Sequence, residues 1–113
     1  MPRHAEDPKW SDPGLLVLAS LADGPRHGSA MVRDVEETSG VRLGPGTLYG
    51  AIARLEGRGL IEALPAEDAR SRPYRLTARG VGVLENQLAT MHRFAGVSRR
   101  RLARLAPAFG GTS

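Results

Sequence analysis

Apolar residues recur at helical spacing in the first part of the chain, in segments separated by glycine- and proline-rich breaks. Residues 11–21 have a proline near their start, which the first turn of a helix tolerates, and continue as a nearly unbroken apolar run. Residues 29–38 carry apolar side chains on one helical face and charged side chains on the other. We therefore predict a buried helix, then an amphipathic helix, then one short extended segment at residues 41–43.

A third helix is predicted between Pro45, which suits the first helical position, and Gly59, a residue typical just beyond a helix end. Leu48, Ile52 and Leu55 form one apolar stripe along this helix. The stripe would face a core, which leaves the other side of the helix free for a different role.

The hydrophobic period then changes from helical to alternating. Residues 60–65 and 72–77 alternate between apolar and polar positions, on either side of the polar segment "AEDARS". This pattern predicts a two-stranded hairpin with a loose tip.

The last predicted helix runs from Thr77 or Ala78 to about residue 105 and carries a heptad pattern. Its seam positions are Val81, Leu84, Leu88, Met91, Ala95, Ser98, Leu102 and Leu105. At ~1.5 Å per residue such a helix is about 42 Å long, more than a domain of this size can cover. An apolar stripe that extends past its own domain needs a partner, and the simplest partner is a second copy of the chain. Gly82 and Gly96 each cost about 1 kcal/mol of helix stability, which leaves a break near Gly96 open.

The order helix, helix, turn, helix, hairpin and long helix is that of a winged helix-turn-helix domain. The predicted fold class is mainly α with a small β-hairpin wing, followed by a long C-terminal dimerisation helix. We expect a flexible N-terminal arm at residues 1–10, a DNA-binding domain at 11–77, the dimerisation helix at 78–106 and a flexible tail at 107–113. The residues expected in the dimer interface are Val81, Leu84, Leu88, Met91, Ala95, Leu102 and Leu105.

In a winged helix-turn-helix domain the third helix inserts its first turns into the major groove of DNA. Thr47, Gly50 and Arg54 lie on the face of that helix opposite the apolar stripe, with Tyr49 beside them. The DNA-binding residues that we expect are His27, Gly46, Thr47, Tyr49, Gly50, Arg54, Arg70 and Arg72. Purely structural roles stay open for four of them: packing of Tyr49 on the hairpin, capping by Thr47, a turn at His27 and a solvated charge at Arg54.

The net charge of +4 is unevenly distributed along the chain. Residues 78–113 hold six arginines and one acid, whereas residues 1–77 are nearly neutral. An acid-free stretch around the second strand of the hairpin holds four arginines, namely Arg70, Arg72, Arg75 and Arg79. Arginines at a wing tip reach phosphate or the minor groove, although Glu67 and Asp68 at the same tip would oppose that contact.

The composition argues against several other functions. The chain has no cysteine and its three histidines lie far apart, so we expect no disulfide and no metal site. No phosphate loop, Ser-His-acid spacing or carboxylate pair is visible, and we expect neither an enzyme nor a cofactor. The longest apolar run, residues 15–19, is too short to span a membrane, and the first ten residues do not form a secretory signal. A cytoplasmic protein is therefore expected.

Three stretches resemble the PadR family of bacterial transcriptional regulators, over about residues 14–85. They read "LLVLASLADGPRHG", "PGTLYGAIARLEGRGLIE" and "RPYRLTARG". The resemblance implies a homodimeric repressor whose C-terminal helices pair the subunits and which a small effector releases. The single C-terminal helix is similar to the shorter-tailed branch. The chain departs from the family at Ser29, where an aromatic residue is usual, at Gly50, where proline is usual, and at Gly44, where serine is frequent.

The expected partners are a near-palindromic double-stranded DNA operator, with half-sites roughly 34 Å apart, and a second copy of the chain. By the same resemblance, a small hydrophobic or aromatic effector would contact Trp10, Met91 and Phe94, although Met91 also suits the dimer core. The alternative is a winged-helix protein-interaction module without specific DNA binding. It would use the acidic face of the second helix or the arginine-rich tail. RNA binding is less favoured because the chain offers no aromatic platform for stacking bases.

Overall fold

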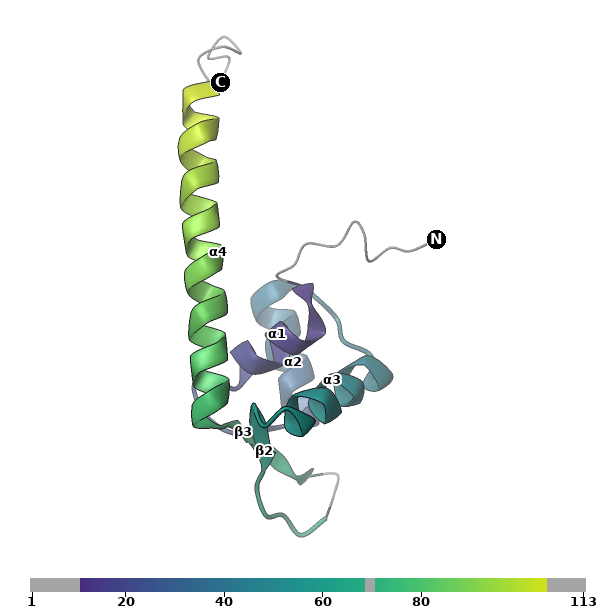
Figure 1. The fold of residues 1–113 in the computed structure, drawn as a ribbon. Coiled ribbons are helices and arrows are strands. Elements are labelled where there is room, and N and C mark those ends of the chain that lie inside the picture. The colour runs from purple at the N-terminus through teal and green to yellow at the C-terminus, as the bar shows by residue number, and fades with distance from the viewer. Residues whose placement is uncertain (1–10, 69–70, 106–113) are drawn as a thin grey trace.

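The computed structural model describes residues 11–68 and 71–105 of the chain (Figure 1). The elements in order are α1 (Pro13–Ser20), β1 (Arg26–His27), α2 (Gly28–Ser39), α3 (Pro45–Gly57), β2 (Ile61–Ala63), β3 (Pro73–Leu76) and α4 (Ala78–Leu105). The predicted fold class is confirmed: short helices and a small sheet form a winged helix-turn-helix unit, and a long helix leaves it.

The sheet differs from the predicted hairpin because it has a third strand. Its order is β1-β3-β2 and both pairs are antiparallel. The added strand pairs Arg26 with Tyr74 and His27 with Pro73. Two residues are too few to show an alternating pattern, so this strand depends on β3 for its formation. Residues 41–43, predicted as a short extended segment, do not pair as a strand and have no regular secondary structure.

Local signals explain where the first three helices begin and end. Asp12 caps α1 by accepting a hydrogen bond from the Leu15 backbone N–H at 3.1 Å. Gly40 follows α2 with φ 78°, and Gly59 follows α3 with φ 74°. Both glycines adopt the left-handed conformation that commonly ends a helix.

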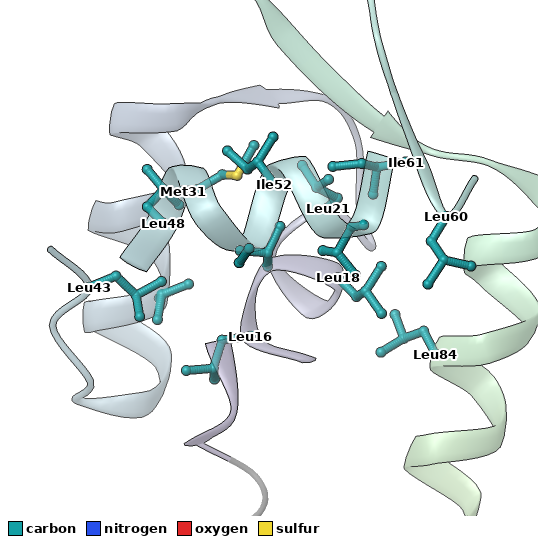
Figure 2. Packing of buried hydrophobic residues seen from close by; sticks show 14 residues of the cluster. Leu16, Leu18, Leu21, Met31, Leu43, Leu48, Ile52, Leu60, Ile61 and Leu84 are labelled. Carbon is teal, nitrogen blue, oxygen red and sulfur yellow. The ribbon is translucent and has the colours of Figure 1, made fainter. Parts of the chain in front are cut away.

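Helix α1 packs against α2, α3 and α4, which explains why its sequence is apolar on most sides. The core around it is aliphatic, and Figure 2 shows side chains from these helices and from β2 converging there. Its members are Leu16, Val17, Leu18, Leu21, Met31, Val35, Leu43, Leu48, Ala51, Ile52, Leu55, Leu60, Ile61 and Leu84. The last of these is the only core member from α4 within the described residues.

Helix α4 starts against the sheet and then extends away from the other elements (Figure 1). Gly80 lies so close to the Leu60 carbonyl that a Cβ atom there would overlap the oxygen. The Thr77 hydroxyl donates to the Gly59 carbonyl at 2.7 Å and accepts from the Gly80 N–H at 3.0 Å. The helix continues through Gly96 without the break that the sequence left open. No helix in the described part of the chain is both long and apolar enough to cross a membrane.

Candidate nucleic-acid interface

The site residues predicted on α3 share one exposed surface. Gly46, Thr47, Tyr49 and Arg54 are exposed, and Gly50 between them is partly exposed. The opposite side of the helix is buried through Leu48, Ala51, Ile52 and Leu55. Burial of one side therefore fixes which side chains the helix presents to a ligand.

Helix α3 begins without a side-chain cap. Its N-cap residue is Gly44, with extended backbone (φ −76°, ψ 165°), and Pro45 occupies the first turn. The capping role considered for Thr47 is not observed, because its hydroxyl has no hydrogen-bond partner among residues 11–68 and 71–105. The first N–H groups of the helix and the Thr47 hydroxyl can therefore serve an anionic ligand.

The Tyr49 side chain lies across the start of α2. A Cβ atom on Gly28 would overlap the Tyr49 hydroxyl oxygen and lie 3.0 Å from the ring carbon that bears it. Gly28 is buried, whereas Tyr49 keeps 49% of its surface exposed. Because Gly28 has no side chain, the Tyr49 side chain can pack against the start of α2 on one side, and its other side faces solvent.

His27 caps α2 and belongs to β1 at the same time. Its Nδ1 lies 3.0 Å from the Ser29 hydroxyl and accepts from the Ala30 N–H at 3.4 Å. Since Nδ1 accepts a backbone hydrogen bond, the proton of the neutral ring lies on Nε2. His27 therefore acts as the helix cap, with extended backbone, and one ring N–H stays available as a donor.

The wing is tied to the start of α2 by the sheet. Because His27 pairs with Pro73, the exposed Arg72 lies one residue away from this junction. At the tip, Asp68 accepts a hydrogen bond from the Ser71 backbone N–H at 3.0 Å. Arg70, which we expected to contact DNA, lies outside the described residues.

Basic side chains near this surface divide into paired and unpaired ones. Arg75 forms a 2.7 Å ion pair with Glu62 on the neighbouring strand, so it adds less free charge to the wing than the sequence suggested. Arg54, Arg58 and Arg72 have no acidic partner within the part of the chain that the structure describes. Unpaired positive charge therefore remains along α3 and at the base of the wing.

The acidic side chains of α2 are less available than their sequence suggested. Asp34 lies 3.6 Å from Arg26, and Glu36 lies 2.9 Å from Arg42. Glu37 is exposed and enters none of these ion pairs. A partner that recognises an acidic helix face would have to compete with internal arginines for two of the three carboxylates.

A groove of about 870 Å³ lies beside the interface, between the start of α1, the second half of α3 and the middle of α4. Met91 and Phe94, both predicted effector contacts, line this groove together with Leu15. The guanidinium-bearing Arg54 and Arg58 line it from α3. Trp10, the third predicted effector contact, falls outside the described residues.

The predicted dimer seam is largely exposed on α4. Exposed fractions are 42% for Val81, 49% for Leu88, 63% for Leu102 and 48% for Leu105. Ala95 is exposed and Met91 partly exposed. Leu84 is a correction: it is 5% exposed because it packs into the core of its own domain, so it offers little surface to a partner.

Two residues of this region were missed by the sequence analysis. Gly28 leaves the space that the Tyr49 side chain occupies. The sequence signal that could have identified it was a glycine directly before an amphipathic helix. Arg58 lies at the C-cap of α3 and lines the groove, but a solvated arginine at a helix end carries no distinctive pattern. No group of three or more histidine, aspartate or glutamate side chains in the described ranges could hold a metal ion.

The chain was compared with known protein families, sequences and structures. A model described as the transcriptional regulator PadR-like family matches residues 17–86. The transcriptional regulator Rv3488 of Mycobacterium tuberculosis is 31% identical over 83 residues, which cover 72% of this chain and 77% of that protein. A PadR family transcription regulator from Clostridium difficile R20291 has a TM-score of 0.70 and 26% identity, over 80% of this chain and 97% of the other.

A longer relative is also similar. An uncharacterized 37.1 kDa protein in transposon TN4556 of Streptomyces fradiae is 49% identical over 88 residues. The matched region is 78% of this chain but only 25% of that protein. The likeness is therefore to one part of a larger chain.

Proposed function

Because the chain belongs to the PadR-like family of transcriptional regulators, we propose that it binds a specific DNA operator as a homodimer and represses transcription there. The observation that carries the proposal is the exposed first half of α3. Its start is uncapped, and Tyr49 in this half lies against Gly28 at the start of α2. The sheet in turn joins the start of α2 to the base of the wing. PadR-like regulators bind DNA, and this surface has the shape and charge for it.

Each element has its own part in the proposed contact. The first turns of α3 enter the major groove, where Gly46 and Gly50 allow close approach and Thr47 reaches a base edge or phosphate. The Tyr49 hydroxyl and the His27 Nε2–H, which flank the start of α2, donate to the phosphate backbone. Arg72, together with Arg70, reaches phosphate or the minor groove from the wing.

The exposed seam of α4 supports the dimer. Two copies would bring two α3 helices to half-sites roughly 34 Å apart on a near-palindromic operator. Free monomers would leave the large apolar side chains Val81, Leu88, Leu102 and Leu105 in water.

The groove beside Phe94 supports release by an effector. It combines apolar walls from α1 and α4 with Arg54, a residue of the proposed DNA contact. A small hydrophobic or aromatic molecule bound there would compete for the position of that side chain. Repression would then be relieved because the ligand favours a conformation that binds DNA less well.

The protein-interaction module is the second candidate, and the ion pairs of Asp34 and Glu36 weigh against its acidic helix face. DNA binding distinguishes the two. We would select DNA from genomic fragments and titrate it by fluorescence anisotropy in a salt series with a scrambled competitor. Tight binding that survives the competitor and weakens steeply with salt is expected for an operator-binding dimer.

Substitutions on the proposed surface test whether it is the surface that contacts DNA. Thr47→Ala and Arg72→Ala should each lower operator affinity by about tenfold, and Arg72→Ala should also reduce the salt slope by about one. The matched control is Arg100→Ala, which removes the same charge from an exposed position far along α4. Weak binding to all sequences, or equal effects of Arg72→Ala and Arg100→Ala, would end the repressor hypothesis.

A further inference from the structure

Arg26 lies in β1, directly before His27, and it is the more enclosed of the charged residues near the wing. Successive side chains of a strand point to opposite sides, so the side chain of His27 reaches the start of α2 while that of Arg26 reaches the end of α1. The side chain of Arg26 is only 28% exposed, although it carries a charge. A partly buried guanidinium needs partners, and the structure provides them.

The guanidinium of Arg26 joins three segments of the winged domain to β1. Its Nε donates to the carbonyl oxygen of Ser20, the last residue of α1, at 2.8 Å. Its Nη2 donates to a carboxylate oxygen of Asp23, in the turn that follows α1, at 3.1 Å. The same nitrogen lies 3.6 Å from a carboxylate oxygen of Asp34 on α2. The end of α1, the turn and α2 thus meet at one side chain.

Each of these contacts suits a guanidinium. The carbonyl groups in the last turn of a helix lack an intrahelical partner and carry the negative end of the helix dipole, so a cation is favourable at Ser20. The Asp34 side chain is 23% exposed, and salt weakens an ion pair that is shielded in this way less than one at the surface. Asp23 is 78% exposed and contributes less. The planar fork of arginine can hold all three groups at once, whereas a lysine ammonium is a single point charge.

The strand that Arg26 anchors adjoins several parts of the proposed DNA contact. The next residue is His27, whose ring caps α2, and it is followed by Gly28, against which Tyr49 lies. In the sheet, Arg26 pairs with Tyr74 of β3, which belongs to the wing. Two residues form only a short ladder, so the contacts of Arg26 with the helices add to what holds β1 in place.

We propose that Arg26 is a positioning residue for DNA binding: it holds β1 against α1 and α2 and thereby fixes where His27 and the wing meet the phosphate backbone. The proposal rests on the proposed function, because it concerns the same DNA contact. Arg26 does not itself contact phosphate, since its guanidinium is engaged inside the domain. Without this anchor β1 separates from the helices, and Arg72, next to the strand pair, is no longer held at a fixed distance from α3.

Operator titration with the full-length protein distinguishes positioning from direct contact. Arg26→Ala should lower operator affinity by about tenfold but leave its salt dependence unchanged, because no phosphate contact is lost. Arg26→Lys keeps the charge without the fork and should recover only part of this loss. The matched control is Arg42→Ala, which breaks the 2.9 Å ion pair with Glu36, a pair that does not involve β1. Equal losses from the two alanine variants, or a shallower salt dependence for Arg26→Ala, would overturn the proposal.

The carboxylate partner of Arg26 on α2 gives a test in which positioning and net charge predict opposite results. Asp34→Asn removes a negative charge at nearly constant size, so a general electrostatic effect would raise the affinity for DNA. Loss of the anchor should instead lower operator affinity by about threefold. Asp23→Asn, at the more exposed partner, should lower it less. A gain in affinity from Asp34→Asn would contradict the role of Arg26.

Amide hydrogen exchange of the free protein separates positioning from a loss of overall stability. In Arg26→Ala the amides of β3 should exchange faster, while those around Ile52 in the middle of α3 keep their wild-type rates. Uniform acceleration would show a general loss of stability, and unchanged β3 amides would show that Arg26 does not hold the strand; either result overturns the proposal. A wild-type protein that binds no selected DNA would overturn the proposed function, and with it the role of Arg26 in DNA binding, even where β3 exchanges as expected.

Discussion

Leu48 and Leu102 occupy equivalent places in two similar helical patterns, yet one is 2% exposed and the other 63% exposed. Leu48 belongs to the winged domain, where α1, α2 and the sheet surround α3 with apolar side chains. Leu102 lies on the part of α4 that extends past that domain (Figure 1). Periodicity thus identifies an apolar face, and only the neighbouring elements decide whether the chain covers it or leaves it for a partner.

The largest effect on stability is expected from a substitution in the core. Leu48→Ala should lower the free energy of unfolding by about 2–5 kcal/mol, because it removes buried methyl groups and leaves a cavity among residues that cannot close it. Leu102→Ala should change the unfolding free energy of the monomer by less than about 0.5 kcal/mol and weaken only the dimer. Urea denaturation at low and high protein concentration separates the two effects. Similar losses for both variants at low concentration would contradict the division into covered and uncovered faces.

The start of α4 is covered by other elements of the winged domain. Substitutions at Gly80 and Gly82 test where this covered part of the helix ends. Gly80→Ala should destabilise the domain by about 1–3 kcal/mol, because the new methyl group would overlap the Leu60 carbonyl and the backbone must shift. Gly82→Ala meets no atom within 4 Å and should stabilise the helix by up to about 1 kcal/mol. Thermal unfolding followed by circular dichroism measures both. A stabilising Gly80→Ala would mean that α4 does not pack closely against Leu60, the residue directly before β2.

Much of the winged domain could be predicted from sequence because its signals are local. Pro45 and Gly59 mark the ends of α3, and the stripe through Ile52 defines its buried face. The third strand could not be predicted, since residues 26–27 form it only by pairing with β3.

For the candidate site, the sequence identified the exposed residues of α3 but not their neighbours. The seat of Tyr49 on Gly28 depends on the packing of two helices, which no spacing reveals. The sequence also placed Leu84 on the free surface of the seam, which was wrong because the heptad pattern does not show that this side chain is buried in the core of its own domain.

Gly28 and Tyr49 are in contact inside the winged domain, so the effects of substitutions at these two positions should depend on each other. Gly28→Ala should displace the tyrosine hydroxyl, costing about 1 kcal/mol of stability and lowering operator affinity severalfold. In a Tyr49→Phe background the ring lacks the hydroxyl oxygen that a Cβ on Gly28 would overlap, so the same substitution should cost less. A double-mutant cycle measured by urea denaturation and by DNA titration gives the coupling. Additive effects in both assays would show that the two residues act independently.

The smallest expected effect concerns the ion pair that holds Arg75 against Glu62. Both side chains are about half exposed, so Glu62→Gln should cost less than about 1 kcal/mol of stability. The same change frees Arg75 on the wing, where added positive charge strengthens binding to phosphate. Operator affinity should therefore rise by a few fold, and the salt dependence should become steeper. Glu37→Gln is the matched control, because it removes an exposed acid from α2 that forms no such pair with a wing arginine. An equal gain from both variants would mean that net charge alone governs affinity, whereas a gain confined to Glu62→Gln would show that the wing contacts DNA and that its own carboxylate restrains it.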